Sequence, residues 1–243
     1  VYADVNFRRA LNYATPREQI VQKVYNDLWK PLYSNVHSSS PFYNPNVQHY
    51  DYDLDKAKKT LSDAGYKINA QGQRLDKSGK PIQLKLIHNK PSAAREKLAV
   101  VLQDQWKKLG IEVQIVAMEW GAFLKALDNA PFDYDAFLIG WSSPSDPHYS
   151  KSNYWSKAGT EANPVKYSNP KVDALYEKGA VEEDEAARVK IYQEIQKLIA
   201  DDLPYIYVAH DTNYGFLNKR IVPNEVTRLG YSYNTHLWRV ASP

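Results

Sequence analysis

Residues 140 to 155 form the segment richest in side chains that could hold a ligand. Large flat rings stand there among short hydrogen-bonding groups, a combination typical of ligand-binding walls. The rings and their polar neighbours are Trp141, Ser142, Ser143, Ser145, Asp146, His148, Tyr149, Asn153, Tyr154 and Trp155. The same composition also suits a surface loop whose tryptophans fill the core, so composition alone leaves both interpretations open.

Paired carboxylates could instead cleave a glycosidic bond. The acids considered for that chemistry are Asp133, Asp135, Asp146, Asp201 and Asp202. Asp201 and Asp202 end a predicted helix beside Pro204, where we expect water to solvate them, and the acidic run 182–185 begins a helix, where the dipole favours negative charge. We therefore assign no catalytic residue and predict that the chain is not an enzyme. A carbohydrate-active enzyme stays as an alternative.

Metal and cofactor motifs are absent from the sequence. No two of the six histidines lie three or four residues apart, and the chain has no cysteine to act as a thiolate ligand or nucleophile. The sequence also lacks the glycine-rich nucleotide fingerprints and the serine elbow of hydrolases. We therefore expect neither a cofactor nor a metal site.

The composition is that of an ordered globular protein with 243 residues, 43% hydrophobic and 24% charged. The net charge of +3 is spread along the chain, whereas a nucleic-acid binder gathers its basic residues into a patch, so we expect no nucleic-acid partner. The chain holds 19 Tyr, 6 Trp and 6 Phe. Most of these rings belong in the core, but Tyr and Trp also suit surfaces that grip sugars or peptides.

Helix and strand patterns alternate along the first 140 residues. Thr15-Pro16-Arg17-Glu18 separates two helices, with Thr15 as the predicted N-cap and Pro16 as the first helical residue. The predicted order is helices over 5–14 and 16–26, a long loop over 30–52, a helix over 53–64, a strand over 82–86, a helix over 92–109, a strand over 111–116, a helix over 120–127 and a buried strand over 135–139.

This order favours an α/β sheet layered with helices. The segment 140–155 follows a strand, so it should lie at the carboxyl edge of the sheet, where α/β folds bind ligands. Further along, we expect helices from Asn169-Pro170 and over 185–200, a strand pair formed by 204–209 and 213–217, and an irregular stretch over 218–243.

Seven segments, taken in order, resemble one protein family. They are DVNFRRALNYATPREQIV, DYDLDKAKKTLSDAGY, SGKPIQLKLI, WKKLGIEVQI, FDYDAFLIGWSSPSDPH, NPKVDALYEKG and DDLPYIYV. In this order the chain resembles the extracellular solute-binding proteins, family 5, of peptide, nickel and oligopeptide ATP-binding-cassette (ABC) transporters. The resemblance implies a periplasmic-binding-protein-like class II lobe with a mixed sheet flanked by helices. It implies that 1–203 is the C-terminal ligand-binding lobe and that 204–243 carries crossover strands and a tail returning toward a missing N-terminal lobe.

The resemblance also implies a set of ligand-binding residues. The family's glycine-tryptophan pair falls on Gly140 and Trp141, whose ring would line the cleft. Peptide binders often carry an aspartate where this chain has Pro144, and some carry an arginine where it has Leu138, so pairing with a peptide's charged terminus is not implied here. Asp146 stands in the family's usual Asp-Pro. The full set of expected ligand residues is Trp120, Trp141, Ser142, Ser143, Pro144, Asp146, His148 and Tyr149.

The function implied is capture of a peptide-like solute by closure between two lobes, as the substrate-binding component of an ABC importer. A binding protein for an oligosaccharide or another neutral solute is the alternative within the same class. The partners implied are the small solute, a membrane permease and the missing lobe. The resemblance places the protein in the periplasm or outside the cell, with a lipoprotein anchor as one form of attachment.

Overall fold

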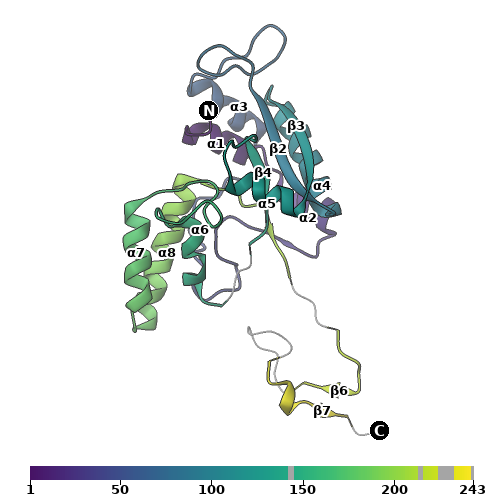
Figure 1. The fold of residues 1–243 in the computed structure, drawn as a ribbon, viewed down its shortest axis with the longest axis vertical. Helices are drawn as coiled ribbons and strands as arrows, with labels where there is room; N and C mark the ends of the chain where they lie inside the picture. The colour runs from purple at the N-terminus through teal and green to yellow at the C-terminus, as the bar shows by residue number, and fades with distance from the viewer. Residues whose placement is uncertain (142–144, 213–215, 224–232, 242–243) are drawn as a thin grey trace.

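A three-stranded parallel sheet organises the first half of the chain (Figure 1). The computed structural model describes residues 1–141, 145–212, 216–223 and 233–241. The sheet has the order β3-β2-β4, formed by β2 (Gln83–Lys90), β3 (Glu112–Glu119) and β4 (Ala136–Leu138). The crossovers are α4 (Ala93–Lys107) and α5 (Trp120–Asp128). The predicted α/β order is therefore confirmed, although β4 is shorter than expected and only half-buried.

Helices cover both faces of this sheet, which is why β2 is buried along most of its length. One face packs against α4 together with α1 (Val5–Tyr13), α2 (Arg17–Tyr25) and α3 (Leu54–Asp63). Leu84 and Leu86 of β2 point into that core, whereas Ile87 points to the other face and meets Phe123 and Leu127 of α5. The alternation along the strand thus sends successive side chains into two separate cores.

A second body is built from the helix pair α7 (Pro170–Val181) and α8 (Glu185–Asp202). Asn169 and Asp184 cap these helices by accepting hydrogen bonds from the backbone amides of Lys171 and Ala187. The short helices η1 (Pro147–Ser150) and α6 (Lys151–Tyr154) both contact α7, and Figure 1 shows α6 beside the pair. The core of this second body consists of Phe42, Tyr154, Val172, Tyr176, Ile191, Tyr192, Ile195 and Ile199.

The segment 204–210 lies between the two bodies and packs against both. Ile206 and Val208 pack on the core of the sheet, whereas Tyr205 and Tyr207 pack on the core of the helix pair. An extended backbone points successive side chains to opposite sides, so this one segment joins both cores.

Strand β5 (Ala209–His210) pairs antiparallel with β1 (Lys30–Pro31) in the long loop. This pairing was not predicted from the sequence, and the expected pairing of 204–209 with 213–217 stays a prediction. Residues 213–215 lie outside the described residues. The expected cap at Thr15 is wrong, because its hydroxyl donates to the Leu11 carbonyl (2.8 Å) at the end of α1. Pro16 takes the N-cap position of α2.

The C-terminal residues extend away from the two bodies (Figure 1). They contain β6 (Ile221–Val222) and β7 (Arg239–Val240), which pair antiparallel, and η2 (Thr235–Leu237). Parallel and antiparallel pairs thus both occur, in separate sheets. In the part of the chain that is described, no helix combines the length and the apolar character needed to cross a bilayer.

Candidate ligand-binding cleft

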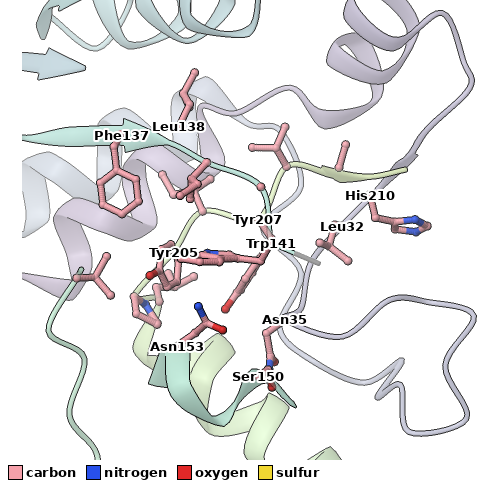
Figure 2. Close-up of a pocket in the computed structure, with 18 of the residues that line it drawn as sticks. Leu32, Asn35, Phe137, Leu138, Trp141, Ser150, Asn153, Tyr205, Tyr207 and His210 are labelled. Carbon is pink, nitrogen blue, oxygen red and sulfur yellow. The ribbon is translucent and has the colours of Figure 1, made fainter. Parts of the chain in front are cut away.

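An open cleft of about 2690 Å³ lies between the sheet and the helix pair. Its walls include the segment that follows β4, the loop after β1, the η1–α6 region and the segment 204–210. Figure 2 shows Trp141, Tyr205 and Tyr207 gathered around the same space, with Asn153 and Ser150 nearby and His210 at its far side. The cleft therefore lies at the carboxyl end of β4, where the strand order predicts a ligand site.

Two of the expected ligand residues present open rings to this cleft. Trp141 lines it and is 44% exposed, and Tyr149 lines it and is 63% exposed. Asp146 also belongs to the wall. Ser142, Ser143 and Pro144 lie outside the described residues, so the prediction for them stays a prediction.

The two other expected residues lie away from the cleft wall. Trp120 begins α5 and stacks on Phe123, with ring centroids 5.8 Å apart, and it is not among the residues that line the cleft. His148 faces the helix pair, where its Nδ1 lies 2.8 Å from the Tyr192 hydroxyl and its ring meets Tyr176 edge-on. Burial and the neighbouring charge of Lys151 lower the pKa of His148.

The Asp146 carboxylate is already bound within the protein. Its Oδ1 accepts a hydrogen bond from the His148 backbone amide (2.8 Å), which caps η1. Arg188 of α8 donates from Nη2 to both Asp146 oxygens, at 2.9 and 3.0 Å. Burial alone would raise the pKa of Asp146, but these two partners stabilise the carboxylate and the pKa lies below its ordinary value.

The other acids considered for catalysis are also paired. Asp133 forms an ion pair with Lys85 (2.6 Å), and Asp135 accepts from the Lys85 amide (2.7 Å). Asp201 pairs with Lys197 (2.8 Å). Asp202 accepts from the Tyr167 hydroxyl at 2.6 Å and from an amide at 2.7 Å. These bonds give the five acids structural partners and leave no pair of unbound carboxylates among them.

A tyrosine cluster forms part of the cleft wall and was not predicted as a site. The hydroxyls of Tyr154 and Tyr207 lie 2.9 Å apart, and the Tyr154 and Tyr205 rings meet edge-on. The Tyr205 hydroxyl is buried and has no hydrogen-bond partner among the described residues, and burial raises its pKa. The alternating tyrosines of the PYIYV sequence were the available signal, since alternation predicts that both rings point the same way.

Arg95 brings a positive charge to the wall beside Trp141. It lies in the first turn of α4, whose N-cap is Ser92, and one of its nitrogens donates to the Asn89 side chain. A Cβ on Gly140 would lie only 3.4 Å from Arg95 Nη2, so the guanidinium lies against the backbone that leads into Trp141. Helical spacing along α4 predicted the helix but did not single out this arginine.

Two histidines meet at the far side of the cleft. The His37 and His210 ring centroids are 3.8 Å apart, and Nε2 of His210 lies 3.0 Å from the Ser38 hydroxyl. Burial lowers the pKa of His210, and the nearby charges of His37 and Lys30 lower it further. Among the residues that the structure describes, no three His, Cys, Asp or Glu side chains come together to hold a metal ion.

Comparison with known families shows which family this chain belongs to. Residues 1–163 match the model of the bacterial extracellular solute-binding proteins, family 5 Middle. The chain belongs to this family. The resemblance found in the sequence is therefore confirmed, and so is the class of fold.

Family 5 members of known structure share the fold closely. The oligopeptide-binding protein AppA from Bacillus subtilis, solved in complex with a nonapeptide, superposes with a TM-score of 0.82 at 30% identity. That match covers 98% of this chain and 48% of AppA. NikZ from Campylobacter jejuni, solved in complex with Ni(L-His), gives a TM-score of 0.79 at 27% identity over 97% of this chain and 48% of NikZ.

Curated family 5 relatives are binding proteins. AppA of Bacillus subtilis (strain 168) is 30% identical over 243 residues, which is 99% of this chain and 45% of AppA. The dipeptide-binding protein of Escherichia coli (strain K12) is 29% identical over 93% of this chain and 41% of its own length. The chain thus spans less than half the length of these relatives.

Proposed function

We propose that this chain forms one wall of the substrate-binding component of an ABC importer, and that its cleft receives a peptide-like solute. The observation that carries the proposal is the open cleft at the end of β4, where Trp141, Tyr149 and Arg95 face the same space. Rings bury apolar side chains, and a guanidinium pairs with a carboxylate through two hydrogen bonds. A peptide supplies both kinds of group.

The proposed mechanism is capture by closure of a second wall over the cleft. The wall in this chain is open, and family relatives have more than twice its length, enough for an opposing lobe. Closure removes the solute from water and adds contacts from the second side. The solute shifts the balance between open and closed forms only through its stronger binding to the closed form.

The chemistry of the wall favours a peptide over a neutral sugar. Within the part of the chain that the structure describes, the Arg95 side chain donates to Asn89 with one nitrogen, which leaves its other donors for a ligand carboxylate. Arg8, Lys30 and Lys166 also contribute positive charge to the lining. An oligosaccharide offers no group that would pair with these charges. The two curated relatives above carry peptides in their names, which supports the same choice.

The partners and location follow from this role. A permease would bind the closed form at the membrane, and the protein would work in the periplasm or outside the cell. The description of the family calls its members extracellular, which supports this location. A lipoprotein anchor is one attachment consistent with that location.

Isothermal titration of the two-lobed protein, with the present chain titrated in parallel, tests the proposal. We expect peptides to bind the two-lobed protein and to bind the isolated chain weakly or not at all, because half of the contacts are absent. A neutral oligosaccharide of similar size to the peptide serves as the control ligand. Binding of the sugar without binding of any peptide would refute the peptide assignment, and tight binding by the isolated chain would refute the shared cleft.

A further inference from the structure

We propose that Asp146 is a positioning residue rather than a partner of the ligand. In this proposal, which rests on the proposed function, Asp146 and Arg188 form a strut that fixes the aromatic segment of the cleft to α8. The part of the wall beside Trp141 then does not pair with the amino terminus of a peptide. Its substrate class therefore includes peptides whose amino ends are blocked.

The strut joins residues 42 positions apart in the chain. Arg188 places Nη2 at 2.9 and 3.0 Å from the two Asp146 oxygens, and its Nε donates to the Gly179 carbonyl (3.0 Å). The guanidinium carbon lies 5.4 Å from the centre of the Phe42 ring and 5.1 Å from that of Tyr192. Ring contacts and a carbonyl acceptor hold the arginine in place, so Asp146 meets a fixed partner.

Two further bonds tie the same segment to the helix pair. His148 Nδ1 lies 2.8 Å from the Tyr192 hydroxyl, and the Ser150 hydroxyl lies 2.9 Å from that of Tyr176. Tyr149, between these two anchors, is exposed to the cleft. Alternate side chains thus hold the backbone while the one between them is presented to the ligand.

The negative charge of Asp146 is already balanced by Arg188 in the absence of a ligand. Its side chain is 57% exposed, so it is accessible, but Arg188 supplies one full positive charge at contact distance. Pairing with an ammonium group would add a second cation beside the first. The two positive charges would repel each other, so the gain from that ammonium is small.

The rest of this wall offers no substitute acid near Trp141. The sequence from 140 to 145 is GWSSPS, which contains no carboxylate. Asp135 and Asp202 line the cleft but accept hydrogen bonds within the protein. Asp211 lies at the far side, where its carbonyl meets His37. A peptide's amino group therefore finds no unmatched carboxylate beside the tryptophan.

A cycle of protein and ligand changes tests the proposal in the two-lobed protein. Titration calorimetry compares one peptide with its N-acetylated form, on the parent and on Asp146→Asn. We expect the substitution to weaken both peptides by the same factor, about fivefold, the size expected of one well-oriented ion pair. Arg188→Lys should act in the same way, since it keeps the charge but loses the planar geometry.

Asp133→Asn is the matched control, because it breaks an ion pair with Lys85 (2.6 Å) that lies outside the cleft lining. It should leave both affinities unchanged. Loss confined to the free peptide in Asp146→Asn would show that Asp146 pairs with the amino group and would overturn the proposal. Unchanged affinity of Asp146→Asn for both peptides would show that the strut does not position the cleft wall and would also overturn the proposal. If the parent bound neither peptide, the proposed function itself would fail, which is a distinct result.

Discussion

Replacement of Trp141 by alanine measures directly whether the cleft wall contacts the ligand. The ring is 44% exposed in the open cleft, so a ligand that closes over it covers that fraction. A tryptophan side chain offers roughly 250 Å², so about 110 Å² would be buried. At about 25 cal/mol per Å², a ligand that buries all of this exposed surface gains about 2.7 kcal/mol of binding free energy. A ligand that buries only part of this surface gains about 1 kcal/mol. The Kd of Trp141→Ala should therefore be between about 5-fold and 100-fold higher than that of the parent.

Trp120 provides a matched control for this measurement. It is also 44% exposed, but it stacks on Phe123 and does not line the cleft. Titration calorimetry of a peptide into both alanine variants of the two-lobed protein separates binding from general loss of a ring. Urea unfolding of each variant checks that the fold is retained.

The two variants should therefore differ in affinity. Trp120→Ala should bind the peptide as the parent does, while Trp141→Ala binds it more weakly. Parent-like affinity in Trp141→Ala would show that the ring only packs in the protein and would refute the assignment of this wall. Equal losses in both variants would show that exposure alone, and not position in the cleft, decides the effect.

Three further predictions concern stability, each measured by urea unfolding. Gly110→Ala should destabilise the fold by more than about 3 kcal/mol, because φ at Gly110 is +82° and the new Cβ would lie 2.6 Å from a backbone oxygen. Gly79→Ala is the control: φ there is +89° but the space is open, so the substitution should cost only about 1 kcal/mol. Equal losses of stability in the two variants would contradict the predicted clash at Gly110. The pKa of His210 is lowered in the fold, so the unfolded chain binds its proton more readily. Stability should thus fall as the pH drops from about 7 through 6.5 toward the lower folded pKa, and His210→Gln should flatten that fall; an unchanged slope would remove His210 as its source. Arg17→Met should cost about 3 kcal/mol or more, because the buried guanidinium donates to three backbone carbonyls that would lose their partner; a loss below about 1 kcal/mol would show that water replaces it.

Local signals in the sequence were enough to predict most helices and strands. The helices α4, α7 and α8 are capped by the residues that directly precede them, which are Ser92, Asn169 and Asp184. Gly65 and Gly110, both with positive φ, follow the ends of two predicted helices. Each of these signals acts over a few residues, through one hydrogen bond or one backbone angle, so the sequence carries it directly. The family resemblance rested on the order of such segments.

Local signals failed where a group had two competing partners. The Thr15 hydroxyl bonds back to Leu11 rather than forward into α2, and the two choices look alike in sequence. Likewise, nothing in the neighbouring residues of Ala209–His210 indicated that this strand would pair with β1, far away in the chain. In both cases the packing of the surrounding elements decided the partner.

The sequence by itself determined the α/β class, the family and the position of the aromatic segment after β4, because periodicity, caps and motif order are properties of neighbouring residues. Only the tertiary structure decided what each side chain in that segment does. Asp146 and His148 turn to Arg188 and Tyr192 of α8, while Tyr149 and Trp141 face the cleft. The physical reason is that an ion pair or a shared wall depends on distances across the fold, which no local pattern fixes.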